Sequence, residues 1–189
     1  MSHAAPENQQ QNRSADELLV VRCQLGEPEA FDDLIARWHG PLWQYIRRMS
    51  GRDDEAQDIL QDVWLRVIRG IARVRDGSRL RGWLFGITRR VLMDRLRRQY
   101  AMPPASDVST DDLAAEPEPS DREQSLEAID AAIETLPLIE REILTLFYLR
   151  DLSLAEIADA LYIPIGTVKS RLFRARRMAR AVIEKETES

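Results

Sequence analysis

The chain has 189 residues, of which 44% are hydrophobic and 31% are charged, and it carries a formal net charge of −5. This length suits one or two small domains, and this composition is that of an ordinary globular protein. No run approaches the roughly 18 apolar residues of a membrane span, and the polar N-terminus lacks the apolar core of a secretory signal. We therefore expect a cytoplasmic protein that makes no membrane contact of its own.

The N-terminal end of the chain contains a polar segment followed by a helix. Residues 1–13 are rich in Gln and Asn, and we expect them to form a disordered tail. Ser14 and Glu17 form a capping box, so a helix is predicted to begin at Ser14 and to end at Gly26. The apolar face of this helix is expected to contain Leu18, Val21 and Leu25.

Three further helices complete an N-terminal domain over residues 14–101. Pro28 suits a first helical position, and Gly40-Pro41 is interpreted as a kink rather than as a helix end. Ile68 belongs to the apolar pattern of the middle helix of the three. These helices are predicted over residues 28–50, 53–71 and about 81–100, with a loop at residues 76–78 before the last.

A linker and a second helical domain make up the rest of the chain. Residues 102–124 combine acidic side chains with prolines, which is typical of a flexible linker. Four helices are predicted in a C-terminal domain over residues 125–185, with Pro137 separating the first from a second at Leu138–Leu149. Because no alternating strand pattern occurs, we predict an all-α fold of two small helical domains.

The last two predicted helices have the pattern of a helix-turn-helix. Tyr162-Ile163-Pro164 separates them, because proline lacks an N–H and pushes the preceding residue toward an extended conformation. An apolar stripe follows each helix, and the rest of the second helix is basic, as a helix that enters the major groove would be. We expect base-edge contacts from Thr167, Ser170, Arg171 and Arg174, and phosphate contacts from Lys169, Arg176 and Arg177. The alternative is a solvated basic face on a core helix.

Charge is segregated along the chain, although its net value is negative. Between residues 66 and 98 arginines are frequent, and the acids there are Asp76 and Asp94. This distribution predicts a second basic surface, which the overall charge conceals.

Catalytic and metal-binding patterns are missing from the sequence. It contains no P-loop, Rossmann glycine pattern, HExxH or nucleophile elbow, so we predict no catalytic residue and no enzyme. One cysteine, Cys23, excludes an intramolecular disulfide, and its apolar helical neighbourhood favours a buried structural thiol over a redox sensor. The acids from Asp53 to Asp62 suit a helix start and a solvated face better than a metal site. We expect no metal and no cofactor.

Four segments, in this order, resemble the extracytoplasmic-function (ECF) sigma factors of the sigma-70 family. They are EAFDDLIARWHGPLWQYIRRMSG, DDEAQDILQDVWLRVIRG, LRGWLFGITRRVLMDRLRR and LPLIEREILTLFYLRDLSLAEIADALYIPIGTVKSRLFRARR. The resemblance implies a transcription initiation factor, used in stress responses, that binds core RNA polymerase. It further implies that the first domain handles the −10 promoter element and assists melting, and that the second recognises the −35 element.

The resemblance also implies roles for residues of the N-terminal domain. The second segment is similar to the family's docking surface for the clamp helices of the polymerase β′ subunit, although a solvent-facing polar stripe is the alternative. Its contact residues would be Asp58, Gln61, Asp62, Trp64 and Arg66. The region before and within the third segment is similar to the −10 reader. Its contact residues would be Arg79, Arg81, Trp83, Arg89, Arg90, Asp94, Arg97 and Arg98.

Within the −10 reader, two features have alternative interpretations. Trp83 or Phe85 could offer a stacking face to a base, but Trp83 shares a predicted core stripe with Leu84, Ile87, Val91 and Leu92, and core packing is the favoured interpretation for that stripe. The loop at residues 76–78 could receive an unstacked base. Capturing such a base would stabilise the melted promoter without covalent chemistry.

Three residues depart from the usual family pattern. Phe is common where this chain has Leu80, Asn is common where it has Arg90, and Gly is common where it has Tyr162. Positive φ is often adopted at the last of these positions, and a tyrosine would be strained there. We therefore expect the turn to be built differently.

The resemblance finally implies a set of partners. They are the β′ clamp helices and β subunit of core polymerase, duplex and single-stranded promoter DNA, and an anti-sigma factor. The acidic linker would run toward the polymerase active-site cleft, or it would act only as a solubilising tether. The alternative function is a stand-alone helix-turn-helix regulator that binds duplex DNA without polymerase, and the second basic region and the acidic stripe disfavour it.

Overall fold

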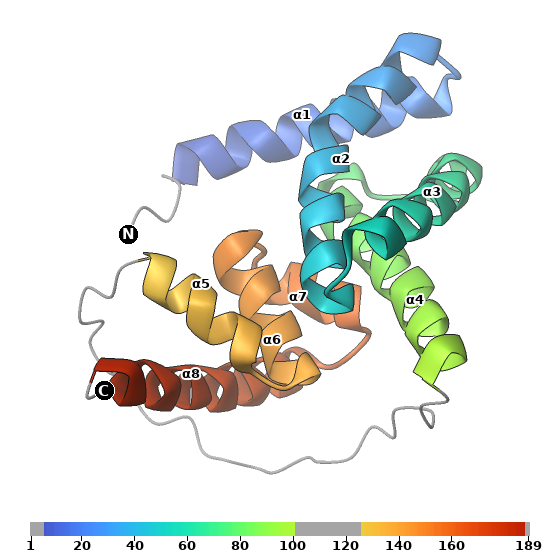
Figure 1. Cartoon of the computed structure of the whole chain (residues 1–189). Helices are drawn as coiled ribbons and strands as arrows, with labels where there is room; N and C mark the ends of the chain where they lie inside the picture. The colour runs from blue at the N-terminus through green and yellow to red at the C-terminus, as the bar shows by residue number, and fades with distance from the viewer. Residues whose placement is uncertain (1–5, 101–125, 188–189) are drawn as a thin grey trace. The chain divides into compact units, whose positions relative to one another are not determined.

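The computed structural model describes residues 6–100 and 126–187, and within these ranges it contains helices and no strand. The α-helices are α1 (Pro6–Gln24), α2 (Pro28–Ser50), α3 (Asp53–Gly70), α4 (Leu80–Tyr100), α5 (Leu126–Thr135), α6 (Leu138–Leu144), α7 (Leu154–Leu161) and α8 (Ile165–Thr187). The all-α prediction is confirmed. The fold has two compact units, one containing α1 to α4 and the other containing α5, α6 and α8 (Figure 1). The predicted linker, residues 102–124, lies outside the described residues.

The first helix differs from the sequence prediction in its start and in its buried face. It begins at Pro6, so residues 6–13 are helical rather than disordered, and Ser14 lies inside the helix. The side chains that face the core are Asp16, Leu19, Val20 and Cys23, whereas Leu18, Val21 and Leu25 are exposed. The burial of Cys23 agrees with the structural-thiol interpretation.

An ion pair explains why α1 turns a charged residue inward. Arg37 of α2 lies 2.9 Å from the carboxylate of Asp16, which is 2% exposed, and its guanidinium also donates to the Asn12 carbonyl. Burial raises the pKa of Asp16, and the positive charges of Arg37 and Arg81 oppose that rise. The partner on α2 therefore sets the face that α1 buries, which the periodicity of α1 alone cannot reveal.

The other helices of this unit pack around α2. It contacts α1, α3 and α4 and continues through Pro41 as one helix, as predicted (Figure 1). Its Tyr45 and Trp38 make edge-to-face contacts with Phe85 of α4, with ring centroids 5.4 and 6.4 Å apart. Gly51 ends α2 in the left-handed conformation that glycine adopts without strain, with φ of 74°.

In the second unit, α5 and α6 pack against the long helix α8 (Figure 1). Pro137 separates α5 from α6, as expected. The predicted helix over residues 138–149 is regular only to Leu144 and continues to Leu149 as a π-helical turn. Ser153 and Glu156 then form a reciprocal cap at the start of α7, with Ser153 N donating to Glu156 Oε2 at 2.7 Å.

The turn between α7 and α8 contradicts our expectation for Tyr162. This residue has φ of 57°, so it adopts the left-handed conformation in spite of its side chain. The Ile163 N–H donates to the Ala158 carbonyl at 3.2 Å, and this bond closes the end of α7 as a Schellman motif does. The turn therefore keeps the usual geometry, with a strained tyrosine in the position where glycine is common.

Candidate functional site

An exposed stripe on α3 combines acidic and apolar side chains. Asp58, Gln61 and Asp62 are all exposed, at the spacing of one helical face. Leu65 and Ile68 extend the same face and are 47% and 46% exposed. We call these five residues the α3 stripe. The sequence interpretation placed Ile68 in the apolar pattern of the helix and missed Leu65, although Leu65 follows Gln61 and Asp62 at four and three residues and Ile68 follows Leu65 at three.

Two residues predicted for polymerase docking are placed differently by the structure. Trp64 is only 9% exposed, so it belongs to the core and offers almost no contact area, which corrects the prediction. Arg66 pairs with Asp94 of α4 at 3.8 Å, so one predicted docking residue contacts one predicted DNA-binding residue. Asp58 lies 3.7 Å from Arg95 of α4. Both ion pairs are exposed and therefore weak, so Asp58 and Arg66 remain accessible to a partner.

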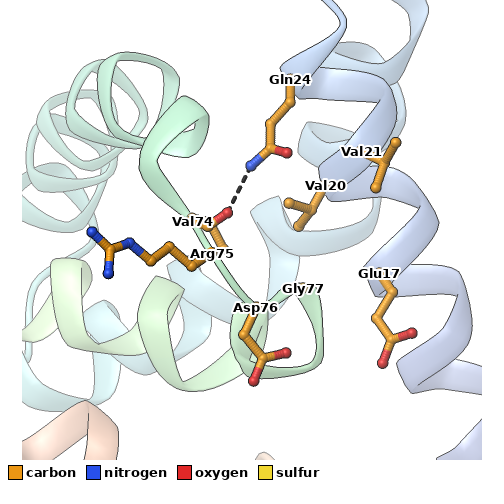
Figure 2. Close-up of a pocket in the computed structure, with 8 residues that line it drawn as sticks. All are labelled: Glu17, Val20, Val21, Gln24, Val74, Arg75, Asp76 and Gly77. Atoms are coloured by element: carbon orange, nitrogen blue, oxygen red, sulfur yellow. Dashed lines mark hydrogen bonds between the residues drawn. The ribbon is translucent and has the colours of Figure 1, made fainter.

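A hollow of about 370 Å³ lies between α1 and the loop that precedes α4. Figure 2 shows its lining, with Gln24 at one end and the carboxylates of Glu17 and Asp76 toward the other. Gln24 holds the loop in place by donating to the carbonyl oxygens of Val74 at 2.7 Å and Ile71 at 3.2 Å. The hollow is thus lined by three valines, Val20, Val21 and Val74, together with hydrogen-bonding groups.

Two local features fix the shape of this loop. Asp76 accepts hydrogen bonds from the backbone N–H and the hydroxyl of Ser78, and these bonds hold the pKa of Asp76 below its usual value. Gly77 approaches α1 so closely that a Cβ atom there would lie 2.8 Å from the Cα of Glu17. A glycine is therefore required at this position for reasons of space.

The predicted −10 residues of α4 divide into packed and exposed groups. Phe85 is 1% exposed and cannot stack on a base. Trp83 is half-buried, and its ring packs so tightly on Gly70 that a Cβ atom there would lie 3.0 Å from it. Arg81 is also half-buried, with its guanidinium 6.0 Å from the Trp38 ring centroid, so part of its side chain packs within its own unit.

The exposed arginines form one surface at the other end of α4. Arg90, Arg97 and Arg98 are exposed at helical spacing, whereas Arg89 is half-buried. Asp94 lies among them, 3.7 Å from Arg97, and its backbone carbonyl accepts a hydrogen bond from Arg98. Arg79, in the loop before α4, is exposed as well.

The basic residues of α8 also separate into different environments. Lys169, Arg174 and Arg177 are exposed, and Thr167, Ser170 and Arg171 are half-buried. Arg176 is half-buried, and its guanidinium lies 5.2 and 5.5 Å from the ring centroids of Phe147 and Tyr148. These ring contacts hold part of its side chain against its own unit, and its predicted role as a phosphate contact stays a prediction. Arg174 pairs with Glu140 at 2.6 Å.

Neither a metal centre nor a membrane span emerges from the parts of the chain that the structure describes. Within residues 6–100 and 126–187, no three His, Cys, Asp or Glu side chains gather as metal ligands would. Over the same residues, no helix has the length and apolar character needed to cross a bilayer.

Known proteins share the sequence of both units. Residues 34–101 match the family model Sigma-70 region 2, and residues 126–178 match the model Sigma-70, region 4. The ECF RNA polymerase sigma factor SigM of Mycobacterium tuberculosis is 34% identical to this chain over 169 residues, which cover 89% of this chain and 84% of SigM. This chain belongs to the ECF sigma factors of the sigma-70 family.

Further comparisons agree with the assignment as an ECF sigma factor. The RNA polymerase sigma-H factor of Pseudomonas aeruginosa is 32% identical over 173 residues, which cover 85% of this chain and 90% of that protein. The solved structure of the sigma factor RpoE in complex with the anti-sigma factor NepR from Bartonella quintana matches with a TM-score of 0.62 and 25% identity, covering 82% of this chain and 96% of that one. Sigma factors are transcription initiation factors rather than enzymes, so the prediction of a non-enzyme is confirmed.

Proposed function

We propose that this ECF sigma factor binds core RNA polymerase through the α3 stripe. The observation that carries the proposal is the exposure of Leu65 and Ile68 directly beside Asp58 and Asp62. An apolar centre with acids at its edge suits a partner helix that carries basic residues, because burial of the apolar side chains supplies affinity while the acids steer association. The clamp helices of the β′ subunit would be this partner, with the β subunit as a further contact.

The −10 element would be read by the loop of residues 74–79 together with the exposed arginines of α4. The hollow beside Gly77 could hold an unstacked base, because Gln24, Glu17 and Asp76 offer hydrogen-bonding groups to its edges. Arg90, Arg97 and Arg98 would neutralise phosphates of the melted strand. Base capture would offset the cost of unstacking, about a few kcal/mol, and so stabilise the open promoter.

The −35 element would be read by α8 as the recognition helix of a helix-turn-helix. Arg171 and Arg174, with Thr167 and Ser170, lie on the side away from the buried stripe and would reach base edges. Lys169 and the exposed Arg177 would contact phosphates.

An anti-sigma factor is a further proposed partner. The related sigma factor RpoE has been solved in complex with the anti-sigma factor NepR, which supports a regulator of this kind for the present chain. Such a regulator would compete with core polymerase for binding to this sigma factor. The cytoplasm, where polymerase is found, is the proposed location.

A stand-alone helix-turn-helix regulator is the second candidate, because α7 and α8 alone would suffice to bind duplex DNA. Two features disfavour it: the α3 stripe and the basic surface of α4 would have no function in such a protein. Both features lie in the unit that matches Sigma-70 region 2.

The polymerase-binding step can be tested by charge reversal on the α3 stripe. The variant Asp58→Lys/Asp62→Lys should lose binding to purified bacterial core polymerase in size-exclusion chromatography, because it would place like charges against a basic helix. Asp32→Lys makes the same replacement at one exposed position of α2; it controls for charge reversal outside the α3 stripe and should bind normally. Unchanged binding of the double variant would exclude the α3 stripe as the docking surface.

A further inference from the structure

A buried carboxylate of α6 lies against the recognition helix α8, apart from the α3 stripe and the hollow. Glu140 of α6 is 4% exposed, and its Oε1 lies 2.6 Å from the terminal nitrogen of Arg174 of α8. An isolated ionised carboxylate is costly to bury, so this site depends on the guanidinium.

Arg174 contacts a buried carboxylate on one side and remains exposed to solvent on the other. Its inner nitrogen is held by Glu140, while its side chain as a whole is 57% exposed. A guanidinium is planar and carries five N–H donors in a fixed fork, so an ion pair at one terminal nitrogen limits the directions that the other donors can take. Long side chains normally sample many rotamers, and a base contact needs one of them.

The pair also changes what Arg174 contributes to DNA binding. Its positive charge is already balanced by Glu140, so it adds less to the general attraction for phosphates than an arginine without an acidic partner would. Its oriented donors, in contrast, are those that recognise guanine by a bidentate contact. Arg177, exposed on the same helix, is the natural comparison.

We propose that Glu140 is a specificity-determining positioning residue, which aims Arg174 at one base pair of the −35 element. This inference rests on the proposed function of α8 and assigns to it a residue from a different helix. Glu140 does not touch DNA in this account and acts only through Arg174.

The test uses full-length protein assembled with purified bacterial core polymerase and a pool of promoter duplexes randomised over the −35 region. Bound duplexes are sequenced to give a base preference at every position. Arg174→Lys keeps the charge but loses the fork, so it should reduce the preference at one position by roughly 5- to 150-fold. Glu140→Gln should reduce the preference at that same position by about threefold to tenfold, because a neutral partner bonds less strongly than a carboxylate.

Three further variants separate positioning from folding and from general attraction. The double variant Glu140→Gln/Arg174→Lys should lose no more preference than Arg174→Lys alone, since both changes act through one side chain. Arg177→Ala should weaken all sequences alike. Glu156→Gln removes the charge of another buried carboxylate, the cap of α7, and should lower the melting temperature without changing the base-preference profile.

The outcomes distinguish this inference from the proposed function. An unchanged profile for Glu140→Gln, or a change at positions that Arg174→Lys leaves alone, overturns the role of Glu140. If Glu140→Gln does not fold, Glu140→Asp, which withdraws the carboxylate by one methylene group, must show the same loss at the same position. A wild-type holoenzyme that selects no −35 sequence at all overturns the proposed function, and the positioning role with it.

Discussion

Replacing Gly77 by alanine should loosen the loop that borders the hollow next to α1. The new Cβ atom would lie 2.8 Å from the Cα of Glu17, whereas ordinary contacts of such atoms begin at 3.4 Å, so the loop or helix must move by about 0.6 Å. Overpacking of this kind costs about 1–3 kcal/mol. The obstacle is backbone, which cannot rotate away as a flexible side chain would.

Tryptophan fluorescence during urea unfolding measures this cost in the intact chain. All four tryptophans lie between residues 38 and 83, so their fluorescence reports on the unit that contains α1 to α4. The midpoint should fall for Gly77→Ala while the denaturant slope stays the same, since the change alters stability rather than the surface exposed on unfolding. The same shift of the loop would reshape the hollow, so we also expect weaker selection of −10 sequences by the holoenzyme.

A second substitution tests the physical reason. Glu17→Ala removes an exposed side chain and should alter stability by less than about 0.5 kcal/mol. It should not rescue Gly77→Ala, because the closest atom belongs to the backbone of α1. Full stability of Gly77→Ala, or its rescue by Glu17→Ala, would refute the steric argument.

Three other predictions concern the two units separately. The raised pKa of Asp16 means that the folded state binds its proton more tightly, so the wild type should lose stability relative to Asp16→Asn as pH rises above about 4; a constant difference in urea midpoint with pH would contradict this. Phe85→Ala should cost about 3–5 kcal/mol by the same fluorescence assay, since its ring is buried against Trp38 and Tyr45, and a cost near zero would contradict that packing. Tyr162→Gly should stabilise the turn between α7 and α8 by about 1 kcal/mol, because it relieves a positive φ, and should therefore raise the midpoint of unfolding measured by far-UV circular dichroism; a lower midpoint would contradict this.

Helical periodicity and turn chemistry predicted most elements of the fold. The helices from α2 to α8 lie close to the predicted ranges. Apolar periodicity marks a helix and Pro or Gly marks its ends, and both signals depend only on residues that are near in sequence. The first helix was predicted less well, since its buried face depends on the ion pair between Asp16 and Arg37, which are far apart in the sequence. The strained Tyr162 was located as an exception, but its conformation was not predicted.

The candidate site shows the same division between local and tertiary information. The spacing of residues identified the acidic part of the α3 stripe and the basic helices, which depend only on a helical repeat, but it did not identify Leu65 and Ile68 as exposed. Pairing between helices could not be predicted: Glu140 with Arg174, Asp94 with Arg66, and Arg176 with two aromatic rings all join separate segments. These pairs decide which of the charged residues are accessible to a partner.

The most direct test of the central claim is run-off transcription by purified bacterial core polymerase from a duplex pool randomised in the −35 and −10 regions. Reactions are run with and without this protein, and the transcribed templates are sequenced. We predict transcripts from a defined two-part sequence only when both protein and core polymerase are present. Failure to bind core polymerase or to stimulate initiation, together with binding of a duplex palindrome by the protein alone, would contradict the assignment as an initiation factor.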